Sequence, residues 1–377
     1  MGCALENTEQ SRPPSVSDPT LVAPATHRVG FLDSLRFIAA FAVVLQHYLE
    51  REAFPWGLWF VNLGPGVFGV ALFFIISGFV MPLSVQRGFA PAEFAIRRLF
   101  RIYPLLLTIF AVVLVASRFS PLPAFDEARG ASFAGWMANL LLVQDFVGAP
   151  KIYGVTWTLI LELIWYALFA GAILTFKGRS ISWLSILAPA GLIVLTMLSL
   201  IVHHRIPAGR IGMLYAAIFG MQAFRHFNGA VGTRRFCIDA IVFTGVMVAA
   251  NAVAFGVFKH PTITLYQAVA PWFVATALFL IVYAPSRIRH AAILKSPLIV
   301  VLGEISYSIY LVHPLVIAAG DTFFDGLARM AFVLLGTVAV SVLTFRLIER
   351  PGMEAGRRVA RRFRGKSVST TAMFARS

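Results

Sequence analysis

Arginine, histidine and acidic side chains interrupt the apolar stretches of this chain, and the first pair lies within LDSLRFIAAFAVVLQHYLE, residues 32–50. Arg36 and His47 are eleven positions apart, which on a helix is about 1100°, or within roughly 20° of three full turns. The two side chains are therefore expected on one helix face, about 16 Å apart along the axis. Asp33, one turn before Arg36, could pair with it. The alternative is that both side chains extend to opposite membrane surfaces.

Two later segments carry further polar groups of the kinds used in proton transfer. Glu162 lies in GVTWTLILELIWYALF, and His313 follows Ser306, Tyr307 and Tyr310 in LGEISYSIYLVHPLV. Spacings of four and three place Ser306, Tyr310 and His313 on one face.

His47, Glu162 and His313 are predicted at a similar depth, provided that the segments alternate in direction. A histidine beside a carboxylate or a second histidine can act as a general acid or base. A single such side chain more often forms a hydrogen bond between helices. The three together favour an acid–base site.

A dense group of arginines, Arg97, Arg98 and Arg101, lies in FAIRRLFRIYP. Guanidinium groups at this density suit phosphate binding, although anchoring at the inner membrane face explains them equally well. Ser77 lies in GVFGVALFFIISGF, where close helix packing is the default expectation. Glu349 in LIERP is expected to form an ion pair at the membrane surface with Arg346 and Arg350.

Composition indicates which elements must hold these residues. Of 377 residues, 59% are hydrophobic and 13% charged, and the mean hydropathy is +0.80, whereas soluble domains carry roughly 25% charged residues. The chain is therefore predicted to be an all-α, polytopic membrane helix bundle. Ten spans are predicted, at 31–49, 61–83, 103–117, 154–176, 181–202, 211–224, 236–257, 268–284, 298–318 and 330–348. The sixth is short enough to be broken or re-entrant, and residues 136–146 are expected along the membrane surface.

The distribution of basic residues predicts the orientation. The net charge is +15, but the basic residues lie between apolar segments and in the tail, which fits sorting to the inner face better than nucleic-acid binding. With the N-terminus inside, inner connections hold twelve Arg and Lys residues and outer ones eight, so both termini are expected in the cytoplasm. The predicted organisation is a disordered tail at 1–28, a membrane domain at 29–352 and a basic tail at 353–377. The two cysteines and the histidines show no metal spacing.

Six blocks in this order resemble the acyltransferase 3 family of integral membrane acyltransferases, from about Phe31 to Pro351. They are LDSLRFIAAFAVVLQH, FFIISGF, RRLFRIYP, TWTLILE, LGEISYSIYLVHP and ERP. The resemblance implies transfer of an acyl group, often acetyl, from cytoplasmic acyl-CoA to a hydroxyl of an envelope sugar or other acceptor. It implies a bacterial cytoplasmic (inner) membrane and no bound cofactor.

The resemblance also assigns roles. Arg36 and His47 are the expected essential pair, Arg98 and Arg101 match a second basic motif, and Glu162 and Tyr307 match lesser blocks. Some members append an extracytoplasmic hydrolase-like domain, for which no room is expected here. The acceptor, the acyl chain, direct transfer against an acyl-enzyme, a partner protein and the oligomeric state all stay open. A proton-coupled exporter is the alternative function.

Overall fold

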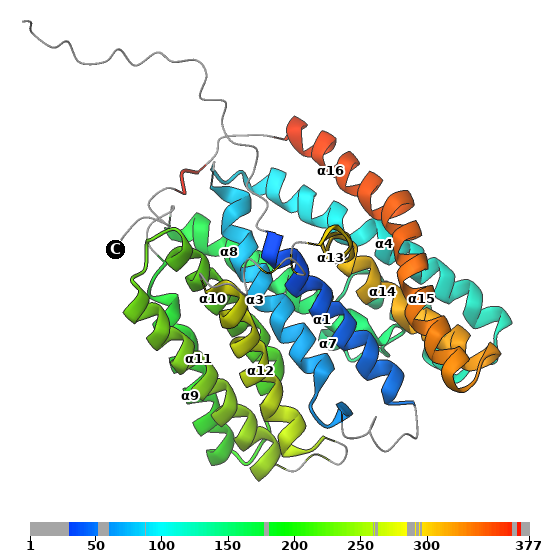
Figure 1. The fold of residues 1–377 in the computed structure, drawn as a ribbon, viewed down its shortest axis with the longest axis horizontal. Coiled ribbons are helices and arrows are strands. Elements are labelled where there is room, and N and C mark those ends of the chain that lie inside the picture. The colour runs from blue at the N-terminus through cyan, green and yellow to red at the C-terminus, as the bar shows by residue number, and fades with distance from the viewer. Residues whose placement is uncertain are drawn as a thin grey trace, which may run out of the picture.

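The computed structural model describes residues 30–51, 60–86, 88–176, 181–258, 260, 263–284, 291, 294, 296–363 and 368–370. The predicted tail at 1–28 lies outside them. Most of the described chain is helical, and its long helices form one bundle (Figure 1). The helices are α1 (Gly30–Leu49), α3 (Pro65–Val85), α4 (Pro91–Phe119), α5 (Asp126–Gly130), α6 (Phe133–Leu140), α7 (Gln144–Val147), α8 (Trp157–Phe176), α9 (Leu184–Ile201), α10 (Ala208–Phe227), α11 (Thr233–Ala252), α12 (Leu265–Tyr283), α13 (Pro297–Glu304), α14 (Ser306–Phe323), α15 (Gly326–Thr344) and α16 (Arg350–Arg362).

The predicted fold class, an all-α membrane bundle, is confirmed. Eight of the described helices are long and apolar enough to cross a membrane, or nine if the bent pair α13 and α14 forms one span. The predicted sixth span corresponds to α10, which is a continuous helix of 20 residues rather than a broken one. It is not one of those eight helices but is largely buried, because α3, α9 and α11 pack around it.

The centre of the bundle is a close crossing of α3 and α10. A Cβ atom on Gly78 would lie 1.8 Å from the carbonyl oxygen of Ala217, and one on Gly220 would lie 1.9 Å from that of Ile75. Glycine at both positions therefore lets the two backbones touch, as small residues commonly do between membrane helices.

Helix α13 meets α14 at an angle of 71°. Gly303 in α13 presses against the backbone of α1, where an added Cβ would lie 2.0 Å from the Asp33 carbonyl oxygen. The hydroxyl of Ser34 also donates to the Leu294 carbonyl oxygen at 2.5 Å. The bend brings Ser306, at the start of α14, beside α1.

The helices share two ends, which we name after α1. The ring of Phe79 in α3 contacts Phe31 in α1, Phe224 in α10 and Tyr283 in α12. The proximal end is therefore where α1 begins and where α3, α10 and α12 end, and the distal end is where α1 ends. Helix α4 begins at the proximal end, since Arg98 donates to Ser84 at 3.0 Å.

The chain continues past the predicted boundary at residue 352 as one helix. A π-helical turn, η5 (Phe345–Glu349), joins α15 to α16, and α16 packs along α4. Further on, Val368 forms an isolated β-bridge with Phe89, and the Thr370 hydroxyl donates to the Val85 carbonyl oxygen at 2.7 Å. These contacts hold the segment 368–370 against the connection between α3 and α4.

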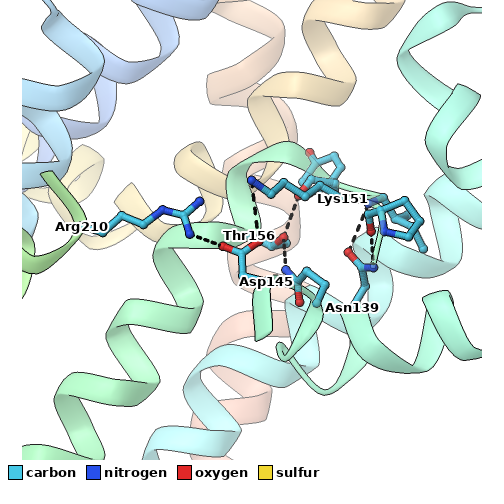
Figure 2. A network of polar contacts seen from close by, with 9 residues as sticks. Asn139, Asp145, Lys151, Thr156 and Arg210 are labelled. Atoms are coloured by element: carbon cyan, nitrogen blue, oxygen red, sulfur yellow. Dashed lines mark hydrogen bonds and ion pairs between the residues drawn. The ribbon is translucent and has the colours of Figure 1, made fainter. Parts of the chain in front are cut away.

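At the distal end, a network of polar contacts stabilises the connection between α4 and α8 (Figure 2). Asp145 forms ion pairs with Arg210 of α10 at 2.7 Å and with Lys151 at 3.7 Å. Asn139 donates to the Pro150 carbonyl oxygen at 2.8 Å. The stretch 136–146, predicted to lie along the membrane surface, forms parts of α6 and α7. Gln144 ties it to the residue before α8 by donating to the Thr156 hydroxyl at 3.1 Å.

Candidate active site

A cavity of about 190 Å³ lies between α1, α3, α4, α8 and α14. On the same scale a single water needs only about 10–15 Å³, so the space can admit part of an extended substrate. It brings together most of the residues that the sequence marked as candidates: Arg36, Ser77, Arg98, Arg101, Glu162, Tyr307 and Tyr310. Ser306 lines it too.

Two arginines reach the cavity from successive turns of α4. The Arg98 guanidinium lies 5.3 Å from the centroid of the Phe94 ring and 5.1 Å from that of Tyr166. These cation–π contacts hold a flexible side chain in one direction. Arg101 lies deeper, 6.0 Å from the Tyr307 ring centroid.

Arg97 does not join this pair. Its guanidinium forms an ion pair with Glu93, one turn earlier, and its side chain is 47% exposed. Because Arg97 lies on the outer face of α4, it does not line the cavity.

Arg36 enters the cavity from α1, and its Nε donates to the Ser306 hydroxyl at 3.3 Å. The bend between α13 and α14 makes this contact, since it presents the first turn of α14 to α1. Asp33 lies one turn nearer the proximal end and is not among the cavity-lining residues.

Glu162 is placed with the arginines rather than with the histidines. It lines the cavity, and one carboxylate oxygen accepts a hydrogen bond from the Tyr166 hydroxyl. No described hydrogen bond or ion pair joins it to His47 or His313.

Sequence reasoning missed Tyr166, which lines the cavity, and it also missed that Glu349 lies beside the site without lining the cavity. The predicted surface ion pair of Glu349 with Arg346 and Arg350 is wrong. Glu349 is only 1% exposed, accepts a hydrogen bond from Ser308 at 2.7 Å, and lies 4.0 Å from Arg101. The turn η5 rotates it into the bundle, whereas Arg350 pairs with Glu354. A single carboxylate ending an apolar helix was the available signal.

Two tyrosines of α14 fasten the cavity wall. The Tyr307 hydroxyl donates to the Ile102 carbonyl oxygen at 2.8 Å, and that of Tyr310 donates to Val155 at 3.1 Å. Thr158 donates to the Tyr310 hydroxyl at 2.8 Å. Tyr310 therefore joins α14 to the start of α8 at the distal side of the cavity.

The two histidines meet beyond Tyr310. His47 Nδ1 lies 3.0 Å from His313 Nε2, and His313 Nδ1 lies 3.2 Å from the Ile309 carbonyl oxygen. The ring of His313 is fully buried, 6.0 Å from that of Tyr310, whereas His47 is half-buried. Neither histidine lines the cavity.

These contacts determine where the protons lie when both rings are neutral. A carbonyl oxygen only accepts, so His313 Nδ1 carries the proton and His313 Nε2 accepts from His47 Nδ1. The free lone pair of His47 is consequently on Nε2, and this atom can take a proton.

Within the described residues, no three His, Cys, Asp or Glu side chains are grouped closely enough to bind a metal ion. The groups present can instead bind anions, accept a proton and stabilise a negative charge.

Comparison with known families matches residues 29–346 to an acyltransferase domain. A protein of Komagataeibacter xylinus named as a membrane-bound transacylase, BcsY, is 31% identical over 90% of this chain and 88% of its own length. The acyltransferase MdmB of Streptomyces mycarofaciens is 26% identical, covering 80% of this chain and 82% of its own. Nodulation protein 10 of Rhizobium leguminosarum bv. viciae is 26% identical, covering 87% and 94%. The comparison with solved structures found no match.

Proposed function

The chain belongs to the family defined by this acyltransferase domain, and from that premise we propose that it moves an acyl group from cytoplasmic acyl-CoA to a hydroxyl of a cell-envelope sugar or polysaccharide. The acyl group is expected to be acetyl. The enzyme would lie in the bacterial cytoplasmic membrane with the proximal end and both termini in the cytoplasm. The observation that carries the proposal is the arrangement of three cavity arginines on the proximal side of a histidine pair.

The donor would enter from the proximal end. Arg98 and Arg101 offer guanidinium groups that suit phosphate oxygens, and the exposed Arg97 adds positive charge beside them. Arg36, on the opposite wall, would hold the donor further in. The thioester would then point towards Tyr310 and the distal end.

His47 Nε2 would act as the general base at that distal position. It takes the proton of the acceptor hydroxyl as the hydroxyl oxygen attacks the thioester carbonyl carbon. The carbon–sulfur bond then breaks, and the CoA sulfur leaves and receives the proton. A variant of this route, in which Nε2 itself accepts the acyl group first, uses the same lone pair.

The test uses membranes that contain the wild-type protein or a His47→Ala variant, with acetyl-CoA labelled in its acetyl group. Label is expected in envelope glycan with the wild type alone, at equal protein level and membrane insertion. Label on the protein itself would assign the covalent route.

Full transfer by the His47→Ala protein would remove His47 from the mechanism. With intact wild-type protein, no CoA release and no label from any acyl donor would contradict the proposed acyl-CoA dependence. The alternative function, a proton-coupled exporter, would give the same result, because an exporter would not cleave acyl-CoA.

A further inference from the structure

A second cavity, of about 410 Å³, lies at the proximal end between the start of α9, the end of α10 and the start of α11. Small-molecule sites commonly have volumes of about 300–1,000 Å³. Its residues are separate from those of the cavity described above, and the acyl-transfer route uses none of them.

The walls of this second cavity are built from hydrogen-bond donors. Arg225 is fully buried, and its Nη1 donates to the side-chain oxygen of Gln222 at 3.2 Å. Because the side-chain oxygen of Gln222 faces Arg225, its amide nitrogen faces away from Arg225. Gln222 is only 2% exposed, and its Nε2 has no hydrogen-bond partner among the described residues. A buried donor without a partner costs about 1–3 kcal/mol, and an acceptor on a bound ligand would remove that cost.

Helix α11 adds a second guanidinium and one acceptor. Arg235 Nε donates to Asp239 Oδ1 at 3.0 Å and Arg235 Nη2 to the Ser185 hydroxyl at 3.0 Å, which aims the group across the cavity. Asp239 is 8% exposed, and its Oδ2 has no hydrogen-bond partner among the described residues. A complementary ligand therefore carries an anionic oxygen for the arginines and Gln222, and a nearby amine or hydroxyl for Asp239.

The cavity opens beside lipid-facing surface. Ile186, on its rim, is 59% exposed, and Leu187 and Val194 continue the exposed apolar surface along α9. Basic pockets between membrane helices at a membrane surface are places where phospholipid head groups bind.

We propose that this cavity binds a phosphate ester that carries a neighbouring amine or hydroxyl group, as in a phospholipid head group. The phosphate oxygens accept from Arg225, Arg235 and Gln222, and the amine or hydroxyl donates to Asp239. The apolar rim favours a phospholipid as the source. The adenosine phosphate end of CoA, with its ribose hydroxyl, has the same chemistry and is the other source.

The experiment measures binding to the full-length protein in detergent by native mass spectrometry, with three probes in turn: phosphatidylethanolamine, phosphatidylglycerol and CoA. Arg235→Gln should weaken binding at this site by about tenfold, because it removes a charged donor. The matched control is Arg234→Gln, which changes the preceding exposed residue, outside the cavity lining. Gln222→Leu tests the buried donor without changing charge.

The probe that responds identifies the source. Loss of lipid binding in Arg235→Gln and Gln222→Leu, but not in Arg234→Gln, supports a phospholipid site. The same pattern with CoA alone supports a phosphate site for the nucleotide. The proposal would be overturned if Arg235→Gln and Gln222→Leu left the binding of every probe unchanged. It would also be overturned if Arg234→Gln lowered binding as much as they do. No step of the assay depends on acyl transfer, so its outcome is independent of the proposed function.

Discussion

At the scale of single residues, the contact between His47 and His313 gives each histidine a different task. His313 is buried, and its Nδ1 contacts the Ile309 carbonyl oxygen. In the proposed mechanism it is a positioning residue that acts on His47 rather than on a substrate and keeps the lone pair on His47 Nε2. The order of the bonds resembles the way a buried acceptor orients the base of a catalytic triad.

Replacing His313 by Phe should lower kcat by roughly 10²-fold, because positioned acid–base groups contribute about that much or more. The KM for acyl-CoA should stay unchanged, since His313 does not line the cavity. His313→Gln, whose side-chain oxygen can accept from His47 Nδ1, should restore part of the rate. Steady-state kinetics with the exposed His204→Gln as control would check this; a Phe variant with normal kcat would mean that His47 works without the contact.

Arg97 and Arg98 are neighbours in the sequence, but their replacement should affect the KM for acyl-CoA differently. Arg98→Gln should raise the KM for acyl-CoA by about tenfold, as expected when a charge-assisted contact to phosphate is lost. Arg97→Gln should change it little, because Arg97 pairs with Glu93 on the outer face. Titrating acyl-CoA against both variants checks the assignment, and equal effects would reduce the cluster to general surface charge.

The sequence predicted only part of how the candidate site residues are grouped in space. Helical spacing placed Arg36 and His47 on one face, and the structure puts Arg36 against Ser306 and His47 against His313. Spacing could not predict that Glu162 lies with the arginines, because that depends on how far α8 extends past α14, where Thr158 rather than Glu162 meets Tyr310. Nor could it show that η5 turns Glu349 inwards.

At the scale of elements, the crossing of α3 and α10 fixes the cavity wall. Ser77 lines the cavity and its neighbour Gly78 touches α10. A shift of α3 at this point would therefore move the cavity wall directly.

Gly78→Ala should destabilise the fold by about 1–3 kcal/mol or more, because the added methyl group meets backbone atoms that cannot move aside. Gly171→Ala in α8 is the matched control, since a Cβ there meets nothing within 4 Å. Thermal unfolding in detergent, followed by fluorescence, would compare them. A melting temperature of the Gly78 variant equal to that of the control would mean that the helices can separate at no cost.

Elements were more predictable than their ends and bends. Apolar runs near 20 residues predicted the long helices, since that length is needed to cross a bilayer. The 71° bend at Ile305 and the helix α16 beyond residue 352 depend on packing against α1 and α4, which hydropathy does not record.

At the scale of the whole molecule, the bundle has two chemically different ends. Arg98 and Arg101 lie on the proximal side of the first cavity, and the second cavity also lies at that end, whereas the histidine pair lies towards the distal end. Orientation in the membrane therefore decides which substrate meets which group.

A cysteine-labelling experiment should establish that orientation. In a background with Cys3→Ser and Cys237→Ser, an Asn228→Cys protein should react with a membrane-impermeant maleimide only in inside-out vesicles. His204→Cys should react only from the outer side. Asn228 lies at the proximal end and His204 at the distal end, and both are exposed. The reverse pattern would place the proximal arginines outside and contradict a cytoplasmic donor.

The contact between Arg101 and Glu349 also has a consequence for biosynthesis. Arg36 and Arg101 are made early, whereas Ser306 and Glu349 are among the last membrane residues to leave the ribosome. At about 5–20 residues per second, the arginines wait for roughly 12 to 54 seconds before their partners exist. A nascent chain released before α14 is made lacks the last wall of the cavity, so the candidate site forms only after most of the chain has been translated.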